Sequence, residues 1–192
     1  MTGGRREVEI KARVSGEVAN FLRSLELSGA VLSPPVRQVD HIFVQRPFRL
    51  SDVSAGVSPI VRIRLTEVEG NANTLLTVKR DLVDQLDCVE HEVQVSDAEA
   101  TAAILEELGL HEVMTVRKVR RQCVLSGFII CLDNVENLGT FVELEASGLF
   151  LDDDSETIRS KMWAVAERLG IGRENAVSMG YDRLLDQIRD EP

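Results

Sequence analysis

Charged and apolar residues alternate without a break along the first predicted strand, residues 6–14. The segment EVEIKARV, from Glu7 to Val14, carries two carboxylates followed by two cations at every second position. Successive side chains of a strand point to opposite faces, so the charged residues share one face and the apolar residues share the other. The pattern is typical of a half-buried strand with a solvated outer face. It also fits a strand that holds a metal ion beside a polyanion.

Seven further segments have strand character, and most of them combine one charged face with one apolar face. These segments are residues 36–45, 60–67, 75–80, 88–95, 116–125, 128–133 and 140–146. Ser126-Gly127 is turn-like and would close a hairpin between two of them. Residues 47–59 are rich in Ser, Gly and Pro, which predicts a long loop that acts as a lid or a disordered tip.

Apolar stripes at helical spacing predict four helices. They cover residues 17–27, the segment from the capping box Ser96-Asp97-Ala98-Glu99 to Leu108, the segment from Asp152 to Leu169, and residues 181–188. The acidic run at 152–154 could bind a metal, but carboxylates at a helix N-terminus are favoured by the helix dipole, and we prefer this structural interpretation. Trp163 lies on an apolar stripe and is expected in the core.

Strands that are mostly joined by hairpins, with helices between and after them, indicate an α+β fold with a large antiparallel sheet. At 192 residues the chain is expected to form a single domain over residues 1–192. The amphipathic helices can cover the apolar faces of the strands.

Composition narrows the possible functions. The chain is 44% hydrophobic and 28% charged, has no apolar stretch of about 20 residues, and begins without an apolar signal-peptide core. We therefore expect a cytoplasmic protein with no membrane partner. The three cysteines lack CxxC spacing and predict reduced, buried thiols, and the three histidines show no zinc spacing. A formal charge of −10 excludes nucleic acid as a partner, so an anionic substrate needs a local basic cluster.

Such clusters occur on the charged faces of the strands. Cations gather on some strands, at Arg62, Arg64, Lys79, Lys118 and Arg120, and carboxylates gather on others, at Glu90, Glu92, Asp133, Glu143 and Glu145. On strand faces that are exposed to solvent, nothing would favour gathering the cations on some strands and the carboxylates on others. In a closed barrel these side chains would line the interior. Burying so many charges would cost free energy unless a bound ligand paired with them. Phosphates suit the cations, and Mg²⁺ or Mn²⁺ suits the carboxylates, so the residues predict a metal–phosphate site.

The same residues resemble a known family. Glu7-Val8-Glu9-Ile10-Lys11 matches the ExExK signature of the CYTH superfamily, the triphosphate tunnel metalloenzymes. The signature is followed in order by Arg62-Ile63-Arg64, Thr77-Val78-Lys79, Glu90-His91-Glu92, Lys118-Val119-Arg120, Leu132-Asp133 and the segment from Gly139 to Glu145. The segments 39–43, 115–118 and 180–185 look most like the class IV adenylyl cyclases.

The resemblance implies an eight-stranded antiparallel β-barrel that forms a tunnel, flanked by helices. It implies that the bound triphosphate contacts a set of basic residues: Lys11, Arg62, Arg64, Lys79, Lys118 and Arg120. It also implies carboxylates that hold Mg²⁺ or Mn²⁺, either directly or by orienting the ligands: Glu7, Glu9, Glu92, Asp133, Glu143 and Glu145. Lys11, Glu9 and Arg64 are the expected catalytic residues, and Lys11 could instead orient an attacking water or hydroxyl. Relatives often pair as homodimers.

Two reactions share this machinery, and both need positioning and charge stabilisation without a covalent intermediate. A cyclase converts ATP to cyclic AMP and pyrophosphate, and the resemblance favours this activity. A triphosphatase hydrolyses thiamine triphosphate or inorganic tripolyphosphate. A domain that only binds polyphosphate or nucleotide is a third interpretation, but pure anion binding gains nothing from so many carboxylates.

Overall fold

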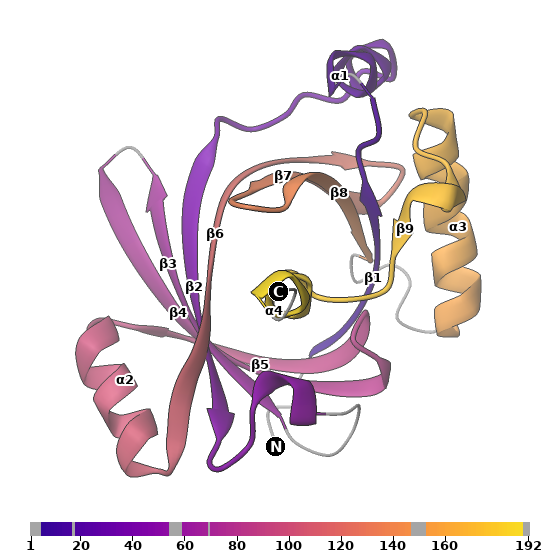
Figure 1. The fold of residues 1–192 in the computed structure, drawn as a ribbon. Coiled ribbons are helices and arrows are strands. Elements are labelled where there is room, and N and C mark those ends of the chain that lie inside the picture. The colour runs from indigo at the N-terminus through magenta and orange to yellow at the C-terminus, as the bar shows by residue number, and fades with distance from the viewer. Residues whose placement is uncertain (1–4, 17, 54–58, 69, 147–152, 190–192) are drawn as a thin grey trace.

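Eight antiparallel strands close into a barrel in the computed structural model, which describes residues 5–16, 18–53, 59–68, 70–146 and 153–189 (Figure 1). The strand order is β5-β4-β3-β2-β6-β7-β8-β1, and β1 returns to pair with β5. The strands are β1 (Arg5–Arg13), β2 (Val36–Gln45), β3 (Ile60–Val68), β4 (Asn71–Asp84), β5 (Asp87–Val95), β6 (Leu110–Leu125), β7 (Phe128–Val135) and β8 (Gly139–Ala146). A short strand, β9 (Ala176–Val177), adds to β1. The eight-stranded barrel that the resemblance implied is confirmed.

Two strands are longer than the sequence predicted. β4 extends beyond the predicted residues 75–80, and β6 begins at Leu110 instead of at Val116. The early part of β6 pairs with the end of β2, where Gln45 lies opposite Leu110. Pairing with a neighbouring strand, more than local propensity, determines such ends.

Four helices of the described residues flank the barrel: α1 (Val18–Leu27), α2 (Ala98–Glu107), α3 (Ser155–Arg168) and α4 (Tyr181–Arg189). The predicted capping box is wrong by one residue, because the carboxylate of Asp97, and not Ser96, accepts from the N–H of Ala100 at 2.9 Å. Asp154 caps α3 in the same way, which confirms the structural interpretation of the acidic run, although residues 147–152 lie outside the described residues.

The predicted lid falls partly outside the described residues, since residues 54–58 are not among them. Within residues 47–53, Leu50–Asp52 forms a single 3-10 turn, η1, and Leu50 is buried. A second 3-10 turn, η3, covers Arg173–Asn175 after α3.

The outward apolar faces of the strands are covered by helices. Packing of α1 and α3 against β1, β7 and β8 buries Ile10, Phe128 and Leu144 together with Phe21 of α1 and Met162 of α3. A second cluster covers β2 and β3, where Leu105 of α2 packs against Phe43, Val61 and Ile63. Trp163 joins the first cluster, and Cys88, Cys123 and Cys131 are free and buried, as the sequence predicted. No helix of the described residues is long and apolar enough to cross a membrane.

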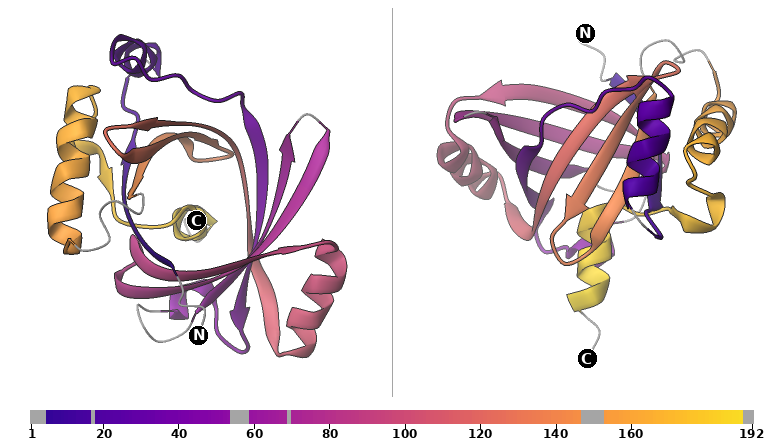
Figure 2. Two further views of the ribbon diagram at one scale, coloured as in Figure 1. Left: turned by 180° about the vertical axis from the view of Figure 1, so that it is seen from behind. Right: turned by 90° about the horizontal axis from the view of Figure 1, so that it is seen from above.

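Helix α4 lies at one end of the barrel. Figure 1 looks along the barrel with α4 at its centre, and the view from above in Figure 2 shows α4 at one end. There Tyr181 packs with Ile42, Val44, Met114 and Phe141, which are inward-facing residues of the strands. The inner surface of the barrel therefore changes along its length, from charged over most of the interior to apolar where α4 fills the end.

Candidate active site

The barrel encloses a cavity of about 590 Å³. Eleven of the twelve predicted site residues line this cavity: Glu7, Glu9, Lys11, Arg62, Arg64, Lys79, Glu92, Lys118, Arg120, Glu143 and Glu145. Asp133 is fully buried in the wall behind them. The structure thus gathers side chains from six strands, spread over most of the chain, around one space.

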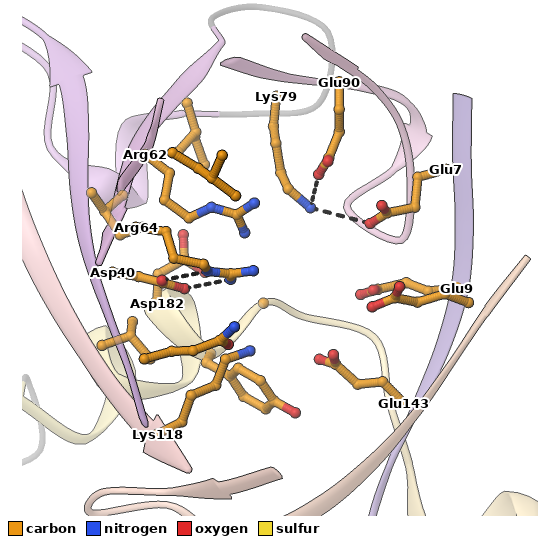
Figure 3. Close-up of a pocket in the computed structure, with 18 of the residues that line it drawn as sticks. Glu7, Glu9, Asp40, Arg62, Arg64, Lys79, Glu90, Lys118, Glu143 and Asp182 are labelled. Atoms are coloured by element: carbon orange, nitrogen blue, oxygen red, sulfur yellow. Dashed lines mark hydrogen bonds and ion pairs between the residues drawn. The ribbon is translucent and has the colours of Figure 1, made fainter. Parts of the chain in front are cut away.

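One wall of the cavity is basic. Figure 3 shows Arg62 and Arg64 of β3 and Lys118 of β6 on the side opposite the glutamates of β1 and β8. Arg64 donates two hydrogen bonds to Asp40, from Nε and Nη2, each at 2.7 Å. Burial opposes ionisation of Asp40, but the charge and hydrogen bonds of Arg64 outweigh it and hold the pKa of Asp40 well below its usual value. A bidentate pair of this kind fixes the guanidinium in one orientation.

Asp40 was not among the predicted site residues. It is the sole charged residue at an inward-facing position of β2, between Gln38 and Ile42. That isolated carboxylate was the signal that could have identified it, because inward positions of the neighbouring strands carry the opposite charge.

Arg62 differs from the other predicted basic residues. Lys11, Arg64, Lys79, Lys118 and Arg120 all form ion pairs with carboxylates of the barrel, whereas Arg62 forms none with a described carboxylate. Its nearest polar contact is the hydroxyl of Thr77 at 3.4 Å, and its Nε is buried without a partner. A guanidinium in this state is available for an anion that enters the cavity.

The opposite wall is acidic. Carboxylate oxygens of Glu7, Glu9 and Glu145 all lie within 4.8 Å of one another, and Glu9 stands directly opposite Glu145 in the β1–β8 pairing. Burial raises the pKa of Glu9 to about 7, against the opposing effect of Lys11, and burial also raises the pKa of Glu145. Like charges opposite one another destabilise a sheet. A divalent cation would offset this repulsion, and three carboxylates are hard oxygen ligands of the kind that Mg²⁺ and Mn²⁺ take.

A second cluster of possible metal ligands shares Glu7 and adds Cys88 and Glu90. Burial raises the pKa of the Cys88 thiol to about 12, and a soft sulfur ligand suits Mg²⁺ and Mn²⁺ less well than a carboxylate does. Lys79 already pairs with both Glu7 and Glu90. The donor set of Glu7, Glu9 and Glu145 therefore fits a hard divalent cation better.

The three other carboxylates predicted to bind metal have different partners. Glu143 pairs with Lys11, 3.1 Å from Nζ, and with Arg120. Asp133 accepts hydrogen bonds from Lys118 at 3.0 Å and from Nε of Arg120 at 2.7 Å. These carboxylates hold cations toward the cavity.

Glu92 lies on β5, away from the acidic wall, and accepts a hydrogen bond from the Thr77 hydroxyl at 3.1 Å. It lines the cavity without joining the cluster of Glu7, Glu9 and Glu145. The six carboxylates predicted to bind metal thus divide into three that converge and three that do not.

Tyr181 links the filled end of the barrel to the charged interior. Its ring centre is 4.3 Å from Nζ of Lys11 and 5.1 Å from Nζ of Lys118, distances that permit cation–π interactions. Lys11 also donates to the carbonyl oxygen of Met179, just before α4, at 3.2 Å. The sequence placed Tyr181 only at the start of a helix, and it is the sole tyrosine of the chain.

Comparison with known proteins gives a consistent result. The model of the CYTH domain matches residues 5–181. A protein of Methanocaldococcus jannaschii named as a putative adenylate cyclase is 27% identical over 179 residues, which cover 91% of this chain and 95% of that protein. The adenylate cyclase CyaB of Aeromonas hydrophila is 26% identical over 186 residues, which cover 96% of this chain and 91% of CyaB.

Solved structures agree on the fold. The protein PH1819 of Pyrococcus horikoshii superposes with a TM-score of 0.77 at 26% identity, covering 94% of this chain and 99% of PH1819. The protein HpAC1 of Hippeastrum, whose description reports a dominant triphosphatase activity, superposes with a TM-score of 0.61 at 18% identity over 97% of both chains. At that identity the second likeness concerns the fold alone.

Proposed function

This chain belongs to the CYTH domain family, and on that premise we propose that it is a divalent-metal-dependent enzyme that converts ATP to cyclic AMP and pyrophosphate. One observation carries the proposal. A single cavity has basic side chains on one wall and three converging carboxylates on the other, which suits a polyphosphate chelated to a metal ion. The cyclase-named relatives favour cyclisation over hydrolysis.

The basic wall would bind the phosphates. Arg62, which has no partner among the described carboxylates, would be available to the phosphates, and Arg64 would present a guanidinium already oriented by Asp40. Lys118 and Arg120 are held toward the cavity by Asp133. Fixed cations of this kind stabilise the charge that develops on phosphate oxygens during transfer.

Glu7, Glu9 and Glu145 would hold Mg²⁺ or Mn²⁺. When bound, the ion would supply positive charge that neutralises the phosphate oxygens. In the proposed reaction the ribose 3′-hydroxyl loses its proton to water and its oxygen forms a bond to the α-phosphorus. The bond from that phosphorus to the bridging oxygen breaks, which releases pyrophosphate. Lys11, held by Glu9 and Glu143, would orient the attacking hydroxyl group.

Hydrolysis of thiamine triphosphate or tripolyphosphate is the second candidate activity. It needs the same basic residues and the same carboxylate cluster, with water as the attacking group. A module that only binds polyphosphate is disfavoured by the carboxylate cluster, since an anion gains nothing from three carboxylates without a metal.

Product analysis tests the proposal. The protein would be incubated with ATP, tripolyphosphate and thiamine triphosphate under Mg²⁺ and under Mn²⁺, and the products resolved by chromatography. We expect cyclic AMP and pyrophosphate from ATP. Orthophosphate from tripolyphosphate or thiamine triphosphate alone would replace the cyclase with a triphosphatase, and no turnover of any triphosphate would leave only a binding module.

A site variant tests the metal assignment. We expect Glu9→Gln to abolish metal-dependent turnover, a loss of at least a hundredfold, because it removes a ligand charge from the cluster of three. Its circular dichroism spectrum and cooperative unfolding should match the unmodified protein. Glu99→Gln, at an exposed position in α2, serves as control and should keep full activity. Retained turnover in Glu9→Gln would show that the metal is held elsewhere.

A further inference from the structure

Three uncharged polar residues form a row inside the barrel next to the basic wall. Gln38 of β2 is directly opposite Thr66 of β3, and Thr66 is directly opposite Asn73 of β4. All three side chains line the cavity. This amide row, Gln38, Thr66 and Asn73, runs across three neighbouring strands, and the proposed phosphate chemistry does not use it.

Two members of the amide row have unmet hydrogen-bonding capacity. The side-chain oxygens of Gln38 and of Asn73 are both buried, and neither has a hydrogen-bond partner among the described residues. A buried acceptor without a protein partner costs free energy unless water or a ligand completes its hydrogen bonding. These two acceptors lie on β2 and β4 with Thr66 of β3 between them, on one cavity surface, and this arrangement suits a polar, uncharged ligand group.

The position of the amide row suits a group attached to a phosphate chain. Gln38 is directly opposite Lys118, and it lies two residues before Asp40 on the same strand. Thr66 likewise follows Arg64 by two residues, a spacing of ~7 Å along a strand. That spacing leaves room for a pentose between phosphates on the arginines and a ring at the row.

The opposite end of the barrel is filled. Tyr181 and α4 pack there against Ile42 and Val44, at the other end of β2 from Gln38. A ligand whose phosphates contact Arg62 and Arg64 therefore has space for its remaining part on the side of the amide row. Leu75, which also lines the cavity, adds an apolar surface beside that row.

We propose that Gln38, Thr66 and Asn73 bind the base of a nucleoside triphosphate. This inference rests on the proposed function and assigns the residues of the cavity that would recognise the base of the nucleotide. A side-chain amide offers one donor and one acceptor side by side. It can pair in two-point fashion with the amino group and ring nitrogen of adenine, and the Thr66 hydroxyl supplies a further donor or acceptor.

Calorimetric titration with two matched ligands tests the inference. One ligand is ATP with methylene groups in place of both bridging oxygens, and the other is the corresponding triphosphate without nucleoside, so that neither is cleaved. The double variant Gln38→Leu/Asn73→Leu keeps side-chain size and removes both amides. We expect it to weaken binding of the ATP analogue at least tenfold and to change binding of the bare triphosphate less than twofold.

Gln45→Leu is the matched control, because Gln45 is exposed on the same strand and faces outward. It should bind both ligands as the unmodified protein does. Should the double variant fail to unfold cooperatively, Thr66→Val and the single amide variants carry the same expectation with a smaller loss of ATP-analogue binding.

Three outcomes overturn the inference. Unchanged binding of the ATP analogue by the double variant would exclude a role for the amides, and an equal loss for both ligands would assign them to the shape of the phosphate site. Equal affinity of the unmodified protein for both ligands would exclude base recognition and leave the triphosphate function intact. Binding of neither ligand would overturn the proposed function itself.

Discussion

Individual cations of the cavity differ in how firmly the protein already holds them. Lys11 and Arg120 each pair with two or more carboxylates, whereas Arg62 donates a hydrogen bond to the Thr77 hydroxyl and pairs with none of the described carboxylates. A cation that is already paired with carboxylates must divide its interactions between them and an incoming phosphate. A cation without such a partner forms its ion pair when the phosphate binds. The free energy of substrate binding should therefore depend more on Arg62 than on its paired neighbours.

Replacing Arg62 tests this difference. We expect Arg62→Gln to raise the KM for the triphosphate substrate by about tenfold to a hundredfold, because a charged hydrogen bond to phosphate is lost. The free energy of unfolding should not fall, since no ion pair of the protein is broken. Arg80→Gln, at an exposed position of β4, should change neither quantity. An unchanged KM for Arg62→Gln would contradict the assignment.

Asp40 should make a pH-dependent contribution to stability. Arg64 holds the pKa of Asp40 below its usual value, so the stabilisation is fully present above about pH 4 and is lost as the pH falls through the lowered pKa. We expect Asp40→Asn to lower the free energy of unfolding by about 3 kcal/mol at pH 7, because Arg64 loses its buried partner. The difference between the two proteins should shrink as the pH falls below 4.

Urea unfolding over a pH series measures this difference. Glu112→Gln provides the comparison, because Glu112 pairs with His41 in a partly exposed setting and should contribute less than about 1 kcal/mol. A difference between Asp40→Asn and the unmodified protein that stays constant down to the acid transition would show that Asp40 acts without its charge.

At the scale of elements, the period-two pattern identified the faces of the strands. Alternation in β1 and β8 placed the glutamates and the apolar residues correctly, because the side-chain direction in a strand depends only on position. The pattern did not show that the inner face of β2 and β6 becomes apolar at Ile42 and Met114. Those residues pack against α4, which comes from the far end of the chain, so no local signal reports it.

Tyr181, the first residue of helix α4, anchors the helix to the barrel. Tyr181 is buried against Phe141, with ring centres 5.2 Å apart, while most of α4 is partly exposed. We expect Tyr181→Ala to lower the free energy of unfolding by about 3 kcal/mol or more. Hydrogen exchange of α4 should speed up well before the barrel strands exchange.

Gln187→Ala is the control for this experiment, because Gln187 is exposed on the same helix and its side-chain amide donates to the sulfur of Met179 at 3.5 Å. It should change the free energy of unfolding by less than about 0.5 kcal/mol. Equal exchange rates of α4 in Tyr181→Ala and in the unmodified protein would mean that the leucines of α4 hold the helix without the tyrosine.

At the scale of the whole molecule, the barrel closes through a short seam. β1 and β5 pair over four positions, from Arg5 with Glu90 to Val8 with Asp87. Asp87 is fully buried there and accepts hydrogen bonds from Arg6 and from the Ser155 hydroxyl of α3. One carboxylate thus joins both strands of the seam to a covering helix.

Removing that carboxylate should loosen the seam first. We expect Asp87→Ala to lower the free energy of unfolding by about 2–4 kcal/mol. Native-state hydrogen exchange should show the largest increase in rate in β1 and β5. Asp153→Ala removes an exposed ion pair with Lys161 and should change stability by less than about 1 kcal/mol. Uniform acceleration over all strands would argue against a local seam.

Barrel closure was expected from the family resemblance, whereas the charged faces of the strands alone were compatible with a solvated sheet or with a barrel interior. The partners across the interior were not predictable. Asp133, expected to hold or orient a metal, accepts hydrogen bonds from Lys118 and Arg120, and Arg64 is oriented by Asp40. Such pairings depend on strand stagger around the barrel, which the alternation along a single strand does not encode.

Because α4 fills one end of the barrel, the two products should leave the cavity in a fixed order. Tyr181 and its apolar neighbours fill one end of the barrel, so we expect substrate and products to pass through the other end. The triphosphate enters the barrel ahead of the nucleoside. Pyrophosphate, bound at the inner arginines, would therefore dissociate only after the cyclic nucleotide has left. Pyrophosphate should then inhibit competitively against ATP, whereas cyclic AMP should act as a noncompetitive inhibitor, and steady-state product inhibition would reveal which leaves first.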